Sequence, residues 1–198
     1  MDGIRLNKFL AERLGISRRQ ADDAIAAGDV LVNEKVARTG QRIDKNEKVC
    51  YNGKIVPTEV GYVYIGMNKP RGYVCSRRRQ GDFPTIYELL PDDYQDLKTV
   101  GRLDRDSSGL ILLTNDGDFA FRMTHPSFVK MKTYEVYLDH DLAPLHQQEI
   151  ADFGIEIGDG ISQLGLERLD TRRHWRVTMS EGRNRQIRRT FGALGYTV

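Results

Sequence analysis

The sequence is poor in the residues from which disulfide frameworks and metal sites are built. It contains only two cysteines, Cys50 and Cys75, which lie in different segments, and its four histidines are scattered along the chain. Neither set has the spacing of a disulfide framework or of zinc ligands. We therefore expect no disulfide framework and no metal.

Long apolar runs are also missing. No stretch approaches the roughly 20 apolar residues that a membrane helix needs, and residues 1–5 lack the apolar core of a signal peptide. These absences predict a cytoplasmic protein without a membrane partner. With 198 residues and 39% hydrophobic content, the chain can still form the core of one medium domain or two small ones.

The net charge of +2 excludes little, but the basic residues are unevenly placed. Residues 168–189 contain eight arginines and only two acidic residues. A second basic cluster consists of Lys69, Arg71, Arg77, Arg78 and Arg79. Because phosphate contacts supply most of the affinity of proteins for nucleic acids, two basic patches in a balanced chain favour a polyanionic partner over a merely solvated basic face.

The first part of the chain, residues 1–58, reads as a small separate domain. Apolar residues at helical spacing predict a helix that ends at Gly15. Ser17 and Gln20 form a capping box that opens a second helix, which ends at Gly28.

Short strands are expected after these helices. The candidates are residues 30–32, Val36 and residues 49–51, the last followed by an Asn-Gly turn. Proline and glycine mark residues 57–61 as a linker. A second domain, residues 62–198, follows the linker.

Predicted strands and helices alternate in the second domain. The strands are residues 62–67, 110–114, 134–138, 165–169 and 175–179, and the helices are residues 118–124, 144–153 and 184–194. A strand-rich pattern with helices packed on it indicates an α+β fold with a mainly antiparallel sheet. In the last helix, Ile187, Phe191 and Leu194 share an apolar face, and Gly195 is the expected C-cap.

The polar loop before residue 110 contains the best candidate for a catalytic group. Asp104 lies on this loop, directly before an apolar strand, and a rigid strand is a suitable support for a catalytic side chain. Two other interpretations compete. Asp104 and Asp106 fit a solvated turn, and the loop imitates the start of a calcium site, although Asn115 replaces the glutamate required at the twelfth position.

A resemblance to a known family favours the catalytic interpretation. The run GRLDRDSSGLILLTNDGD, residues 101–118, resembles the central motif of the RsuA-type pseudouridine synthases, the group that modifies ribosomal RNA. Three further segments resemble motifs of this family in the same order: MNKPRGY at 67–73, KTYEV at 132–136 and EGRNRQIRR at 181–189. Residues 1–58 resemble the S-four type RNA-binding domain.

This resemblance implies a fold and a reaction. The expected architecture is an N-terminal S-four-like α/β domain followed by a mainly antiparallel-sheet catalytic domain. The expected activity is the isomerisation of a flipped-out uridine in ribosomal RNA, which needs no cofactor or metal. By the resemblance, Asp104 starts the reaction, Tyr134 stacks on the target base, and Arg188 pairs with the catalytic acid. Whether Asp104 acts as nucleophile or removes a ribose proton stays open.

The basic residues expected to contact RNA fall in both domains. They are Arg5, Lys8, Arg18, Arg19, Lys35, Arg38, Lys69, Arg71, Arg102, Arg105, Arg183, Arg185 and Arg189. The expected partner is ribosomal RNA, with the large subunit favoured over the small, and the protein is expected to be a monomer.

Two departures from the family pattern qualify these expectations. Ser107 stands where the motif often has threonine, which keeps the hydroxyl group. Family members usually continue with a further basic strand segment beyond the position of Val198, so the catalytic domain is expected to lack that segment. The alternative function is a non-catalytic RNA-binding protein of ribosome assembly. The joint presence of the acid, the tyrosine and the arginine argues against it.

Overall fold

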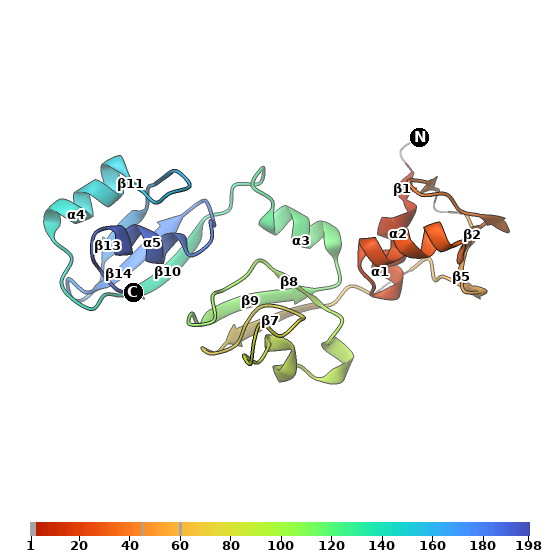
Figure 1. Cartoon of the computed structure of the whole chain (residues 1–198), viewed down its shortest axis with the longest axis horizontal. Helices are drawn as coiled ribbons and strands as arrows, with labels where there is room; N and C mark the ends of the chain where they lie inside the picture. Colours follow the sequence, from red (N-terminus) through yellow and green to blue (C-terminus); the bar gives the residue numbers. More distant parts are fainter. Residues whose placement is uncertain (1–2, 45, 60) are drawn as a thin grey trace. The chain divides into compact units, whose positions relative to one another are not determined.

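The computed structural model describes residues 3–44, 46–59 and 61–198, which form two compact units, Met1–Arg122 and Met123–Val198. Figure 1 shows the course of the chain and the element labels used below. The first unit contains the expected N-terminal domain together with the first part of the expected catalytic domain. The division of domains at residues 57–61 therefore stays a prediction, and residue 60 lies outside the described residues.

Two helices open the first unit, as the sequence predicts. Helix α1 spans Leu6–Leu14 and helix α2 spans Arg18–Ala27. The Ser17 side chain accepts a hydrogen bond from the Gln20 backbone and the Gln20 side chain accepts one from the Ser17 backbone, so the capping box is confirmed. Gly15 and Gly28 adopt left-handed φ values of 69° and 85°, which end the helices where expected.

A small antiparallel sheet packs with these helices. Its strand order is β3 (Lys35–Val36), β2 (Val30–Val32), β5 (Val49–Tyr51) and β6 (Lys54–Ile55). A further ladder of β1 (Ile4–Arg5) and β4 (Arg42–Ile43) was not predicted, because two-residue strands leave no periodic pattern. The core of this region includes Leu6, Leu10, Ala21, Ile25, Val30 and Val49.

The rest of the first unit is built around a three-stranded antiparallel sheet. Its strand order is β7 (Tyr64–Lys69), β9 (Gly109–Thr114) and β8 (Lys98–Val100). Ile111 and Leu113 pack on one face against Ile86 and Leu97. The 3₁₀ turns η1 (Ile86–Leu89) and η2 (Asp92–Tyr94) precede β8, and helix α3 (Gly117–Thr124) follows β9. Strand β8 was not predicted.

The second unit also contains a three-stranded antiparallel sheet. Its strand order is β10 (Lys132–Tyr137), β14 (His174–Met179) and β13 (Gly165–Arg168). The hairpin of β11 (Ile155–Glu156) and β12 (Ile161–Ser162) lies between β10 and β13 in sequence order. Trp175, Val177 and Phe191 belong to the buried core of this unit. Both units thus confirm the α+β class with antiparallel sheets.

The helices of the second unit depart from prediction in detail. The single helix expected at 144–153 consists of α4 (Pro144–Gln148) and a π-helical turn, η3 (Glu149–Phe153). Helix α5 spans Gln186–Ala193 and begins two residues late, because Arg185 adopts a left-handed φ of 48°. Its end is a Schellman motif, since Gly195 donates to the Gly192 carbonyl and Tyr196 to the Phe191 carbonyl.

No helix among the described residues is long and apolar enough to cross a membrane.

His174 connects two parts of the second unit through a pair of carboxylates. Its Nδ1 lies 2.6 Å from Asp170 Oδ1 and its Nε2 lies 2.6 Å from Glu135 Oε1, while its ring stacks on Tyr137 at 4.0 Å. An imidazole that donates to both carboxylates must carry two protons. Burial opposes this charge, but the hydrogen bonds to Asp170 and Glu135 outweigh it and raise the pKa of His174 above 6.5.

The first prediction concerns the pH dependence of stability. The raised pKa of His174 gives a stabilisation that is complete below pH 6.5 and is lost as the pH rises through the folded-state value. The His174→Gln variant should therefore differ most from the parent in unfolding free energy near pH 6, and the difference should shrink above that pH. Urea unfolding across pH 5–9 measures it. The exposed His125→Gln change is the control. A pH-independent difference in unfolding free energy for His174→Gln would contradict a protonated His174 held between Asp170 and Glu135.

Candidate active site

Asp104 lies on the loop that connects β8 to β9. The loop folds back through a turn in which the Ser107 N–H donates to the Asp104 carbonyl at 3.1 Å. The residue is half-buried rather than fully exposed, and Asp106 beside it is half-buried as well. The loop is thus an ordered turn that leaves the Asp104 side chain partly accessible.

The last residue of β7 holds this loop from inside. Lys69 is fully buried, and four backbone carbonyls lie within hydrogen-bonding distance of its ammonium and share its three N–H groups. The Nζ–O distances are 3.0 Å to Pro70, 3.0 Å to Asp104, 3.3 Å to Arg105 and 2.8 Å to Ser107. Three of these carbonyls belong to the loop of Asp104, so one cation determines the path of that loop.

This placement corrects the expected role of Lys69. The sequence suggested an RNA contact, but a fully buried ammonium with four carbonyl partners has no access to phosphate. Burial lowers the pKa of Lys69, while the nearby Cys75, Asp106 and Asp104 act in the opposite direction. A buried ammonium is tolerated only when hydrogen bonds replace its water. We therefore reassign Lys69 from RNA contact to positioning of the Asp104 loop.

The other expected RNA contacts near this loop differ in their surroundings. Arg71 and Arg102 are exposed. Arg105 is half-buried, and its Nε forms an ion pair with Asp106 Oδ1 at 3.0 Å. Its guanidinium also lies over the ring of Phe83, 4.0 Å from the ring centroid. Sequence analysis did not single out Phe83.

Tyr134 and Arg188 belong to the second unit, whereas Asp104 belongs to the first. Tyr134 lies on β10 opposite Val177 of β14, half-buried against the core of the second unit. It lines a surface recess together with Thr133, Glu135, Leu169 and Arg176. An aromatic ring in a recess fits the expected stacking role, which stays a prediction.

Arg188 lies on α5, one turn before the fully buried Phe191. It is half-buried, and its Nη1 donates to the Val198 carbonyl. Its expected pairing with the catalytic acid stays a prediction. Arg185, directly before α5, is exposed and has the left-handed backbone already noted.

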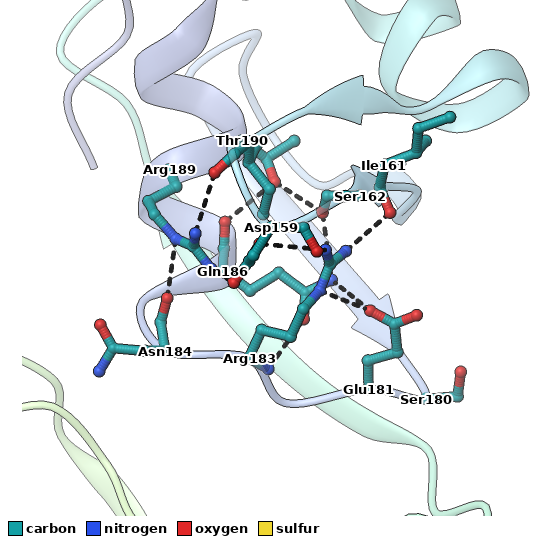
Figure 2. Close-up of polar contacts among 12 residues, drawn as sticks. Asp159, Ile161, Ser162, Ser180, Glu181, Arg183, Asn184, Gln186, Arg189 and Thr190 are labelled. Carbon is teal, nitrogen blue, oxygen red and sulfur yellow. Dashed lines mark hydrogen bonds and ion pairs between the residues drawn. The ribbon is translucent and has the colours of Figure 1, made fainter.

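Two arginines of the basic segment hold the second unit together instead of facing solvent freely. Asp159, in the loop between β11 and β12, lies 3.2 Å from Arg183 Nη1 and 2.8 Å from Arg189 Nη2. Arg183 also donates to the Ile161 carbonyl, and Arg189 donates to the Ile157 and Asn184 carbonyls. Figure 2 shows Asp159 with the two guanidinium groups.

The expected RNA roles of Arg183 and Arg189 are therefore shared with a structural role. Each guanidinium already binds at least one carboxylate, and that of Arg183 binds both Asp159 and Glu181. Each also binds at least one backbone carbonyl, which restricts the donors left for phosphate. Asp159 was missed by sequence analysis, since an aspartate in a Gly-Asp-Gly turn reads as a solvated residue.

A buried polar cluster lies beneath these arginines. Gln186 donates to Ser162 Oγ at 3.1 Å, and the Thr190 hydroxyl donates to the same oxygen at 2.7 Å. All three side chains are at most 2% exposed. The cluster fixes the first turn of α5 to strand β12, as Figure 2 shows.

The N-terminal basic residues also include both exposed side chains and one that is paired within the protein. Most are exposed and thus accessible to RNA: Arg5, Arg18, Arg19, Lys35 and Arg38. Lys8 instead forms an ion pair with Asp118 of α3 at 2.6 Å. The described residues contain no group of three or more histidine, cysteine, aspartate or glutamate side chains placed to hold a metal ion.

Two family models match the chain. One, described as RNA pseudouridylate synthase, matches residues 63–193. The other, described as S4 domain, matches residues 4–49. The matches cover the segments in which the sequence motifs and the Asp104 loop lie.

Curated relatives match nearly the whole chain. The ribosomal small subunit pseudouridine synthase A of Pasteurella multocida is 38% identical, over 98% of this chain and 85% of the relative. The protein of the same name from Yersinia pestis is 37% identical, over 98% and 84%. An uncharacterized RNA pseudouridine synthase of Aquifex aeolicus is 33% identical, over 98% and 82%.

A solved structure shares the fold. A crystal structure described as that of a pseudouridylate synthase superposes with a TM-score of 0.67 at 34% identity, covering 98% of this chain and 85% of that one.

A second prediction tests the ammonium of Lys69. The Lys69→Met variant keeps the apolar stem but leaves four carbonyls without their donor, so the unfolding free energy should fall by about 2–4 kcal/mol. Urea denaturation measures this change. The exposed Lys54→Met substitution in β6 is the control and should stay within about 0.5 kcal/mol of the parent. Equal stability of the two variants would contradict the role of Lys69.

A third prediction concerns the buried polar cluster. Ser162→Ala removes the oxygen that accepts from both Gln186 and Thr190, so it should lower the unfolding free energy by about 1–2 kcal/mol. The exposed Ser180→Ala change serves as the matched control in the same denaturation experiment. A loss no greater than that of the control would show that the cluster contributes nothing to stability.

Proposed function

The chain belongs to the RNA pseudouridylate synthase family, and from this premise we propose that it isomerises one uridine of small-subunit ribosomal RNA to pseudouridine, with Asp104 as the catalytic carboxylate. The single observation that supports the assignment of Asp104 most strongly is the carbonyl cage of Lys69. It holds the Asp104 loop in one conformation while the carboxylate-bearing residue stays half-buried.

The chemistry is an internal exchange of bonds. The bond between N1 of uracil and C1′ of ribose breaks, the base turns, and a bond between C5 and C1′ forms. C5 gives up a proton and N1 gains one, so the reaction needs neither an electron donor nor a group donor. The residues must therefore position the base and stabilise charge.

Two routes use the same carboxylate. Asp104 either attacks the nucleoside as a nucleophile or removes a ribose proton so that a glycal forms. Both routes need the ionised form of Asp104. By the family motif at residues 181–189, we assign to Arg188 the role of pairing with the catalytic carboxylate. We assign to Tyr134 the stacking on the turning base.

The proposed substrate is RNA of the small subunit. The relatives from P. multocida and Y. pestis carry small-subunit names, so the preference for the large subunit drawn from the sequence finds no support in them. Exposed N-terminal residues supply the proposed phosphate contacts there: Arg5, Arg18, Arg19, Lys35 and Arg38. In the remaining chain, we propose Arg71, Arg102 and Arg185 for the same role.

The alternative is an RNA-binding protein without catalysis. Such a protein needs basic surfaces but no ordered carboxylate loop. The Lys69 cage, with its buried charge, is difficult to explain for a protein that only binds RNA, and it favours the catalytic proposal.

A fourth prediction tests this function directly. The parent protein should form pseudouridine at one position of an unmodified small-subunit RNA transcript, mapped at single-nucleotide resolution. Asp104→Asn should lower the rate at least about a thousand-fold, as loss of an essential catalytic group does. It should still bind the transcript, because the basic surfaces are unchanged.

The matched control is Asp93→Asn, which changes an exposed carboxylate of η2 in the same unit and should keep the parent rate. Large-subunit transcripts belong in the same experiment, since modification there alone would overturn the proposed subunit. Binding by the parent without modification of either RNA would favour the non-catalytic alternative.

A further inference from the structure

The ring of Phe83 is exposed in a segment that is otherwise firmly anchored. It is 44% exposed, and it lies in the short hairpin closed by the bridge between Gln80 and Phe83. After it, the Pro84 carbonyl accepts from Val74 at 3.0 Å, and Ile86 donates to the Val74 carbonyl at 3.1 Å. The backbone around the ring is therefore fixed, while much of the ring faces solvent.

A cation covers part of this ring. The guanidinium carbon of Arg105 lies 4.0 Å from the ring centroid, and its Nε pairs with Asp106 at 3.0 Å. The backbone of Arg105 is held too, since its carbonyl accepts from the Gly72 N–H at 2.8 Å and from Lys69 Nζ at 3.3 Å. Ring and guanidinium thus form a preorganised stack, which we call the Phe83–Arg105 platform.

The platform is attached directly to the proposed catalytic loop. Arg105 is the chain neighbour of Asp104, and the ammonium of Lys69 binds the carbonyls of both residues. The same buried charge therefore sets the position of the catalytic carboxylate and of the stacked pair.

The segment before the platform carries charged side chains of both signs, most of them paired. Arg77 donates to the Asp96 and Leu97 carbonyls, and Arg79 pairs with Glu88 at 2.9 Å, so both anchor the segment. Between them Arg78 is exposed, and within the described part of the chain its guanidinium makes no hydrogen bond or ion pair. An exposed aromatic ring stacked on a guanidinium is suited to a nucleic-acid base, which offers a flat face for stacking.

We propose that the Phe83–Arg105 platform stacks against an unpaired base of the RNA substrate that neighbours the uridine modified at Asp104. This inference rests on the proposed function and adds a base-binding site to it. Extrusion of a uridine removes stacking from its neighbours, at a cost of a few kcal/mol that contacts elsewhere offset. An aromatic face next to the catalytic loop replaces part of that lost stacking.

The experiment separates stacking from chemistry. All binding measurements use the Asp104→Asn background, in which RNA binds without reaction. The probe is a small-subunit RNA fragment that carries 2-aminopurine, in turn, at each position within three nucleotides of the modified uridine. At one of these positions, stacking on the platform should change the fluorescence when protein binds.

Four substitutions of Phe83 distinguish stacking by its aromatic ring from simple packing of its side chain. Phe83→Ala and Phe83→Leu should abolish the fluorescence change and weaken binding about ten-fold, as expected from the loss of one stacked base. Phe83→Tyr and Phe83→Trp should restore both. Tyr94→Ala, at a similarly exposed aromatic residue of the same unit, should behave as the parent.

The outcomes are distinguishable. If Phe83→Leu restores binding and the fluorescence change, the ring has only a packing role and the platform is overturned. The same conclusion follows if no 2-aminopurine position responds while the parent with Asp104 forms pseudouridine, and in that case the proposed function stands. If the parent forms no pseudouridine in any transcript, the function fails first, independently of Phe83.

Discussion

The candidate site depends on one buried positive charge. The ammonium of Lys69 binds four carbonyls, three of them in the Asp104 loop. Lys69 is the last residue of β7. The antiparallel register places Lys69 opposite Gly109, where β9 begins, so the sheet carries the charge to the base of the loop. A neutral side chain of the same length could fill the space but could not orient the carbonyls. The register of the sheet therefore also sets the position of the Asp104 loop.

Local signals predicted the parts of the fold that local interactions build. The capping box of Ser17, the glycine caps of the N-terminal helices and the apolar strand before residue 115 are all present. Strand β8 was missed because Lys98–Val100 contains a single apolar residue. The π-helical turn η3 was expected as part of an α-helix because it keeps a helical apolar pattern. The buried position of Lys69 had a signal that was not used, since Lys69 shares the inward face of β7 with Ile65 and Met67.

Composition alone did not predict which basic residues are bound within the protein. The density of arginine between residues 168 and 189 indicated a polyanion, yet Arg183 and Arg189 bind Asp159 and backbone carbonyls. Lys8 and Lys69 are also engaged within the protein. A count of basic residues cannot distinguish cations bound within the protein from cations free to bind RNA. Asp159, which pairs with both arginines, lies in the β11–β12 hairpin, more than 20 residues earlier in the sequence. The family motifs predicted the site residues, and the fold shows which of the basic side chains are already bound within the protein.

The backbone of Arg185 is strained at the start of α5. Its φ of 48° is a conformation that glycine adopts freely, whereas a residue with a Cβ atom loses about 1 kcal/mol there. A glycine at this position would relax the backbone. The arginine thus makes the start of α5 less stable than a glycine would, and only interactions of its side chain, which glycine lacks, can offset that loss.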